Sequence, residues 1–229
     1  MSVGAGQEHA FLATPEHCYY CFQAILAELD REEVPRAISL PDTREKLYVA
    51  KELIERSLFV SWNEYSTKNE AEQQKNKPRL RGCIGTFQPQ EFPGGLARFA
   101  RQAAFHDTRF SPISKQEVPR LDCAVSLLSP FESCKDYLDW QLGFHGVYIE
   151  FKHPLMPREE LTATFLPEVA TAQSWSKQQT IDTAIRKAGW NGAITQELLD
   201  SLRVSRYTSS KCNASYAQYL RWKQSQSDA

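Results

Sequence analysis

Apolar and polar residues follow two different periods along this chain, and the period separates helices from strands. Apolar residues recur at helical spacing after Thr14-Pro15-Glu16, which supplies an N-cap residue, a proline at the first helical position and an acid in the first turn. This predicts a helix over about 15–30. The same reasoning predicts further helices over 43–55, 95–105, 180–188 and 195–202, and a last one that Asn213 caps.

Other stretches alternate or run apolar in a way that is typical of strands. Leu58 to Trp62 is β-branched and aromatic, and it predicts a buried strand. A polar segment, Ser66 to Lys77, separates it from the next strand, so we expect an antiparallel hairpin with a mobile loop. Further strands are predicted over 121–127, 147–151, 161–166 and 203–207.

The strand from Pro78 to Phe87 carries the most suggestive chemistry. A period of two places Leu80 and Ile84 on one face, and on the other face Arg79, Arg81 and Cys83. Guanidinium groups close to a thiol favour the thiolate. The pattern therefore predicts a reactive cysteine at position 83, with the two arginines as ligand-binding groups.

Two glycines flank this cysteine, and their role can be interpreted in two ways. Without Cβ atoms, Gly82 and Gly85 would let another molecule approach the Cys83 sulfur. Alternatively, Cys83 is a small buried hydrophobic residue in a glycine-rich strand that packs against another backbone. The sequence alone leaves both open.

Composition limits the classes of function. The chain has 229 residues, 41% of them hydrophobic and 24% charged, with a formal net charge of −1. This is the balance of a globular protein with one large domain or two lobes. With a net charge so close to zero, the protein has no overall electrostatic attraction to a polyanion or an anionic membrane. We find no apolar run of membrane-spanning length and no secretory signal in Met1 to Ala13, so we expect a cytoplasmic or nuclear protein without a membrane partner.

The six cysteines are too scattered for a disulfide framework, and we expect free thiols. Cys18-x-x-Cys21 looks like half a zinc site, but both sulfurs fall on the apolar stripe of the first helix and no second ligand pair follows. Core packing is the favoured interpretation, so we predict no structural zinc or other metal. Without a P-loop or a Gly-x-Gly-x-x-Gly element, we also predict no cofactor.

Several blocks, in order along nearly the whole chain, resemble the AMMECR family, named for the Alport syndrome, midface hypoplasia and elliptocytosis chromosomal region. They are Leu80 to Thr86, Asp107 to Ile113, Val125 to Leu128, Asp139-Trp140, His145 to Phe151, Thr164 to Ala170, Gln179 to Asp182 and Arg203 to Tyr219. The resemblance implies an α+β fold of two closely packed lobes, each a small, mostly antiparallel sheet with helices. It implies a single domain over 10–223, with flexible termini at 1–9 and 224–229.

The resemblance supplies no established reaction. In some prokaryotes the family is fused to, or encoded beside, Memo-type and radical SAM proteins. This implies a shared modification pathway and makes Memo-type proteins candidate partners.

Two hypotheses of function follow. The first is a Cys-dependent enzyme with Cys83 as nucleophile in a cleft between the lobes, His145 as general base and Glu168 orienting the imidazole, with His106 as a rival base. Each of the three lies at a strand end or beside a glycine, and each lies in a block that resembles the family. The substrate class stays open.

The second hypothesis is a binding module without catalysis. Arg79, Arg81 and Arg109, with the basic and aromatic segment Arg203 to Lys223, would receive a nucleotide or RNA. The near-zero net charge argues against tight binding of nucleic acid. A protein-interaction scaffold is a third interpretation.

Overall fold

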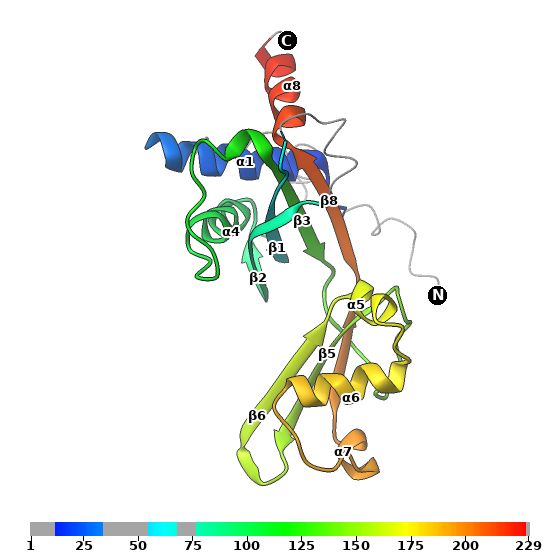
Figure 1. Ribbon diagram of the computed structural model, residues 1–229. Coiled ribbons are helices and arrows are strands. Elements are labelled where there is room, and N and C mark those ends of the chain that lie inside the picture. The colour runs from blue at the N-terminus through cyan, green and yellow to red at the C-terminus, as the bar shows by residue number, and fades with distance from the viewer. Residues whose placement is uncertain (1–11, 34–54, 68–76, 228–229) are drawn as a thin grey trace, which may run out of the picture. The chain divides into compact units, whose positions relative to one another are not determined.

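The computed structural model describes residues 12–33, 55–67 and 77–227 (Figure 1). It divides into two compact units. Unit 1 comprises Met1–Leu128 and Ser210–Ala229, and unit 2 comprises Ser129–Ser209. Most of the helix predicted over 43–55 and most of the polar loop between 66 and 77 lie outside the described residues.

Unit 1 is built on a four-stranded sheet with the order β2-β1-β3-β8. The strands are β1 (Glu55–Glu64), β2 (Arg79–Glu91), β3 (Leu121–Leu128) and β8 (Ser209–Ser215). The predicted antiparallel pairing of the first two strands is confirmed, with Ser61 opposite Cys83. All eight residues of β3 are buried, so this strand is covered on both faces and not only on its apolar one.

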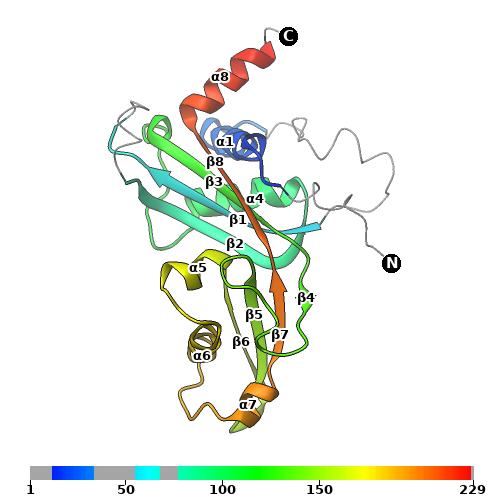
Figure 2. The ribbon, with the colours of Figure 1, turned by 90° about the vertical axis from the view of Figure 1, so that its right-hand side faces the viewer.

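Helices α1 (Pro15–Asp30) and α4 (Gly94–Phe105) pack against each other and against this sheet (Figure 2). As predicted, α1 begins after Thr14, whose N–H donates to Nδ1 of His17 at 2.9 Å. The indole of Trp62 donates to the Ala100 carbonyl at 2.9 Å, which joins the sheet to α4. The predicted helices over 15–30 and 95–105 are thus confirmed.

The end of unit 1 differs from the prediction. The last helix, α8 (Tyr216–Ser227), begins three residues after Asn213, and the N–H of Gln218 donates to Oγ of Ser215. Asn213 instead lies in β8 and donates to the carboxylate of Asp122 at 3.3 Å. The prediction of Asn213 as the cap is wrong because β8 extends past it to Ser215. A short 3-10 helix, η2 (Val118–Arg120), precedes β3.

Unit 2 has a second antiparallel sheet with the order β4-β7-β5-β6. Its strands are β4 (Glu132–Ser133), β5 (Gly146–His153), β6 (Met156–Phe165) and β7 (Arg203–Tyr207), and its helices are α5 (Pro167–Ala172), α6 (Lys177–Lys187) and α7 (Gln196–Asp200). Apolar residues of α6 and α7 share a core with those of β5 and β7. The strands predicted over 147–151 and 203–207 are confirmed, whereas β6 is longer than expected.

The protein is therefore an α+β fold with a mostly antiparallel sheet in each unit, as expected. Within the described ranges, none of the helices is long and apolar enough to cross a membrane.

Candidate functional site

A bulge in β2 resets the faces of the strand that carries Cys83. Gly82 lies opposite Trp62 but Leu80 lies opposite Asn63, so Arg81 is an extra residue in the ladder. Because side chains alternate by two, one extra residue exchanges the faces beyond it. The predicted common face for Arg79 and Cys83 is therefore wrong, and so is that for Leu80 and Ile84, whereas Arg79 and Arg81 both approach Oε2 of Glu64.

The bulge places Arg81 inside the protein. Its side chain is 5% exposed, its Nε donates to Oε1 of Glu117 at 2.8 Å, and its Nη2 donates to the Ser111 carbonyl at 3.1 Å. Burial alone would raise the pKa of Glu117, but hydrogen bonds from Arg81 and Ser114 outweigh it and lower that pKa. Arg81 is thus a buried cation whose Nε and Nη2 bind groups of the protein, and its role in ligand binding stays a prediction.

Arg79 is also paired. Its guanidinium donates to Glu64 at 2.8 Å, and Arg120 donates to the other carboxylate oxygen of Glu64. Burial would raise the pKa of Glu64, but these arginines lower it overall. Arg79 stays exposed at the surface, with part of its charge already balanced.

The third predicted arginine, Arg109, lies at Cys83 itself. Among the strands that the structure describes, β2 is at an edge of its sheet, so backbone groups on its outer side face no other described strand. At Cys83 the backbone N–H donates to Oδ2 of Asp107 at 2.9 Å, and Nη2 of Arg109 donates to the Cys83 carbonyl at 3.0 Å. The Asp107–Arg109 clamp, as we name this pair, therefore takes the place of a strand at this one residue.

The clamp is held by charge. Arg109 donates to both oxygens of Asp107, from Nε at 2.9 Å and from Nη2 at 2.6 Å. The Arg109 guanidinium and the backbone N–H of Cys83 hold the pKa of Asp107 well below its usual range, against its burial. The Asp107 side chain is 4% exposed but that of Arg109 is 57% exposed. In the part of the chain that the structure describes, Nη1 of Arg109 has no acceptor, so its two N–H groups can receive an anion.

The thiol of Cys83 is half-buried and has a polar neighbour. The hydroxyl of Ser61, on the paired strand, donates to Sγ of Cys83 at 3.0 Å. This hydroxyl gives the sulfur a hydrogen-bond donor on the neighbouring strand. The site therefore combines a held backbone, a hydrogen-bonded sulfur and a partly free guanidinium.

Gly82 and Gly85 serve packing, and not the approach of another molecule to the Cys83 sulfur. A Cβ on Gly82 would lie 1.8 Å from the Ala103 carbonyl oxygen of α4, and one on Gly85 would lie 2.2 Å from the Phe59 ring. Both positions need glycine because helix and ring pack there. The packing interpretation of the glycines is thus correct.

The other residues of the predicted catalytic set, His145 and Glu168, belong to unit 2, whereas Cys83 belongs to unit 1. The arrangement of the three stays a prediction. Nδ1 of His145 accepts the backbone N–H of Gln141 at 2.9 Å, and burial followed by Arg206 lowers the pKa of His145. The imidazole is therefore neutral at pH 7, with its proton on Nε2. Acting as a base requires the Gln141 bond to open.

Glu168 has an ordinary structural environment. It is exposed in the first turn of α5, where a carboxylate favours the positive end of the helix dipole. No hydrogen bond joins its carboxylate to His145 in the described chain. The rival base His106 is exposed at the end of α4, where its backbone N–H donates to the Gln102 carbonyl.

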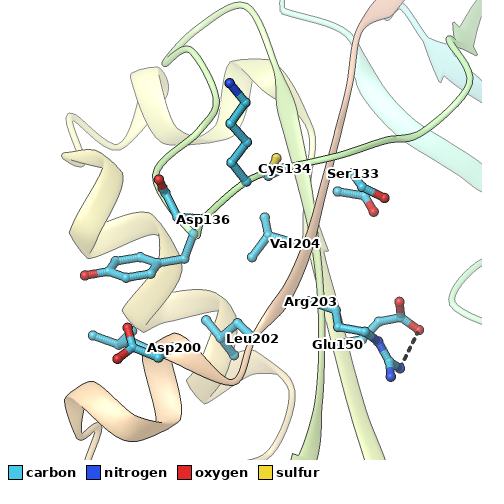
Figure 3. Close-up of a pocket in the computed structure, with 12 residues that line it drawn as sticks. Ser133, Cys134, Asp136, Glu150, Asp200, Leu202, Arg203 and Val204 are labelled. Carbon is cyan, nitrogen blue, oxygen red and sulfur yellow. Dashed lines mark ion pairs between the residues drawn. The ribbon is translucent and has the colours of Figure 1, made fainter.

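Unit 2 has a cavity of about 460 Å³ that the sequence did not indicate. The lining residues come from three stretches, namely the end of β4 with the segment after it, strand β5, and the segment that runs from α7 into β7. They include Cys134 and charged groups of both signs (Figure 3). Figure 3 shows Arg203 turned toward Glu150, 3.7 Å away, and away from Asp136 and Asp200. Burial raises the pKa of the Cys134 thiol, so this thiol is not activated. None of the six predicted site residues lines this cavity.

Two residues of the Cys83 site escaped the sequence analysis, Ser61 and Asp107. In the sequence, the one feature that pointed to Asp107 was the segment Asp107-Thr108-Arg109, in which a carboxylate and a guanidinium group lie two residues apart. Over the described residues, no group of three or more His, Cys, Asp or Glu side chains could hold a metal ion.

Comparison with known proteins assigns the chain to a family. The AMMECR1 family model matches residues 18–212. The chain belongs to the AMMECR1 family. An uncharacterized protein of Arabidopsis thaliana is 36% identical over 208 residues, 91% of this chain and 88% of that protein. An uncharacterized protein of Schizosaccharomyces pombe is 35% identical over 205 residues, 90% of this chain and 94% of that protein.

A solved structure supports the fold. The crystal structure of an uncharacterized protein from Pyrococcus horikoshii matches with a TM-score of 0.59 at 22% identity, over 88% of this chain and 93% of that one. This AMMECR1 family member therefore shares its fold with an archaeal protein.

Proposed function

We propose that this AMMECR1 family protein is a thiol-dependent enzyme in which Cys83 attacks an electrophilic carbon of a substrate that carries a carboxylate or a phosphate. The observation that carries the proposal is the geometry of Arg109. One side of its guanidinium holds Asp107 and the Cys83 carbonyl, while Nη1 stays free beside the residue that bears the thiol. A fixed cation next to a nucleophile serves to position an anionic substrate.

The chemical step is that of acyl transfer. Cys83 loses its proton to a base, and the Ser61 hydroxyl stabilises the resulting thiolate. The sulfur forms a bond to the carbonyl carbon of the substrate, the bond to the leaving group breaks, and the leaving group departs with a proton. Water or a second substrate then attacks the thioester and releases Cys83. His145 is the base that the sequence proposes.

The clamp gives this step rigidity. Because Asp107 holds both Arg109 and the Cys83 N–H, the guanidinium and the nucleophile's backbone share one anchor. A site held in this way keeps its geometry without any reorganisation when substrate binds.

Two alkylating reagents of similar size test the proposal. Iodoacetate is an anion and iodoacetamide is neutral, so the ratio of their rates at Cys83 measures the local cation. In Arg109→Gln we expect this ratio to fall by about 3-fold, the effect of one charge near the surface. Arg109→Lys keeps the charge and should keep most of the ratio. The Cys134 peptide of the same samples serves as the internal control.

An unchanged ratio at Cys83 in Arg109→Gln would exclude Arg109 as an anion-binding group. A Cys83 thiol that reacts with neither reagent in the folded protein would exclude the enzyme hypothesis.

A further inference from the structure

The turn of the β5–β6 hairpin carries large apolar side chains in solvent. Leu155 is 78% exposed and Met156 is 52% exposed. Nδ1 of His153 accepts the backbone N–H of Leu155 at 3.2 Å and that of Met156 at 3.1 Å. These hydrogen bonds fix the backbone of the turn, so Leu155 is held out into solvent on an ordered segment.

A cavity of about 510 Å³ opens beside this turn. The turn and α7 lie at the same end of the unit 2 sheet (Figures 1 and 2). The apolar walls of the cavity come from the turn, from the segment after α6 and from α7, and they are Pro154, Leu155, Trp190, Ala193 and Leu198. We refer to this cavity together with the turn residues 154–156 as the hairpin patch.

The indole of Trp190 is a fixed wall of the hairpin patch. Its Nε1 donates to the Ala193 carbonyl at 3.0 Å, and Nη1 of Arg186 donates to the Trp190 carbonyl at 3.0 Å. The ring meets the His153 ring edge to face, with 5.3 Å between the ring centroids. A Cβ on Gly192 would lie 2.2 Å from the Trp190 ring, so the chain packs closely behind it. The cavity is therefore formed before any partner arrives.

The apolar surface extends beyond the cavity. A small molecule inside the cavity would leave most of Leu155 and Met156 in contact with water. Contiguous exposed apolar patches mark surfaces that bind other proteins, and tryptophan is enriched among the residues that supply the binding energy there. The hairpin patch therefore fits a protein partner better than a small ligand.

Two charged residues at the cavity identify the kind of protein. Lys152 and Glu197 both line it and both are exposed, and neither forms an ion pair within the described ranges. The patch thus offers one cation and one anion. A two-fold axis places the same patch on both subunits, so each of these charges can meet its opposite on the other copy. The formal net charge of −1 gives two copies little mutual repulsion.

We propose that the hairpin patch is a two-fold interface between two copies of this chain. Leu155 of each copy packs against the partner's Trp190, and Lys152 of each copy pairs with the partner's Glu197. The interface uses residues of unit 2 alone. It is independent of the Cys83 site and of the function proposed for that site.

Sedimentation equilibrium of the full-length chain, with dithiothreitol present to exclude disulfide-linked dimers, tests the interface. We expect a reversible dimer in the wild type. Leu155→Ser should weaken dimerisation by about 10-fold or more, because it removes an apolar anchor from the interface. The matched control Phe144→Ser changes a side chain of the same unit that is 55% exposed and lies outside the patch, and it should leave dimerisation unchanged.

Charge reversal tests the pairing across the two-fold axis. Lys152→Glu and Glu197→Lys each bring like charges together in two places, so each alone should weaken dimerisation by about 3-fold or more. The double variant restores opposite charges and should return the dissociation constant to within about 2-fold of the wild-type value. Rescue of this kind requires that the two residues face each other from different copies.

Three results would overturn the proposal. A wild-type chain that stays monomeric up to about 1 mM would show that the hairpin patch does not bind a second copy and would leave it to another partner. A dimer that Leu155→Ser does not weaken would show that the two copies meet at another surface. Single charge reversals that the double variant fails to rescue would exclude the two-fold pairing.

Discussion

The most deeply buried charged groups of the protein's two units differ in how far they are shielded from solvent. In unit 1, Arg81 and Asp107 are almost fully buried, and each has a partner of opposite charge within 2.8 Å. In unit 2, Arg203 is 63% exposed and pairs with Glu150 and Glu160 at the surface. Buried charges are costly unless they are paired and hydrogen-bonded, whereas exposed pairs contribute little. In unit 1, Arg81 and Asp107 are therefore held in place beside the strand that carries Cys83. In unit 2, Arg203 and its partners are exposed and are held less firmly.

This contrast identifies the unit with the better candidate for chemistry. A rigid ionic clamp positions groups to a fraction of an ångström, which catalysis needs. The ion pair at the unit 2 cavity, Arg203 with Glu150, lacks this burial, with side chains that are 63% and 31% exposed. Substitutions in each unit test this difference.

The largest effect is expected from Asp107→Ala. It leaves the Cys83 N–H without an acceptor and frees Arg109, and it should lower the free energy of unfolding by about 2 to 4 kcal/mol. Arg203→Ala in unit 2 is the control and should cost less than about 1 kcal/mol. Urea unfolding measures both. Equal losses would contradict the contrast between the units.

Asp122 is a buried carboxylate in unit 1 that pairs with no guanidinium group among the described residues, and its charge lowers stability instead of raising it. Burial raises the pKa of Asp122 to about 6, although Asn213 lowers it in part. Between pH 4 and 6 the folded state binds more protons than the unfolded chain, so this group lowers stability as the pH rises through that range. Above pH 6 the full penalty is present.

Asp122→Asn should therefore raise the free energy of unfolding at pH 7.5 by about 1 to 3 kcal/mol. It should also flatten the pH dependence between pH 4 and 6. Thermal unfolding across this pH range gives the measurement. A variant less stable than the wild type at pH 7.5 would show that the Asp122 charge is needed for folding.

The smallest effect on stability is expected from His145→Ala, since the imidazole is partly exposed. If His145 is the general base, this variant should lower the rate at which iodoacetamide labels Cys83 at pH 7 by several-fold. The matched variant His106→Ala should leave that rate unchanged. The reverse result would transfer the role of base to His106.

Local structure was predictable from the sequence, and the contacts of the site were not. Thr14-Pro15 predicted the start of α1 because helix capping depends on residues that are adjacent in sequence. The bulge at Arg81 was hidden because it depends on how β2 aligns with β1. Asp107 bonds to a backbone group 24 positions away, which no periodicity records.

The cysteines show the same limit. Helical spacing correctly placed Cys18 and Cys21 in the core. Asn213 looked like a helix cap, whereas Asn213 and its neighbour Cys212 both lie in β8. A strand position brings Cys212 to Cys18, and a helix-cap position gave no reason to expect this contact.

The central claim is that Cys83 is the nucleophile, and the order in which the six cysteines react tests it most directly. The folded protein is labelled with iodoacetamide over a range of pH, and the rate at each cysteine is resolved by peptide mass spectrometry. We predict that Cys83 reacts first and that Ser61→Ala slows its reaction, because Sγ loses the hydroxyl that favours the thiolate. If Cys83 stays unlabelled while Cys212 reacts, Cys83 is a packing residue and the proposed enzyme is excluded.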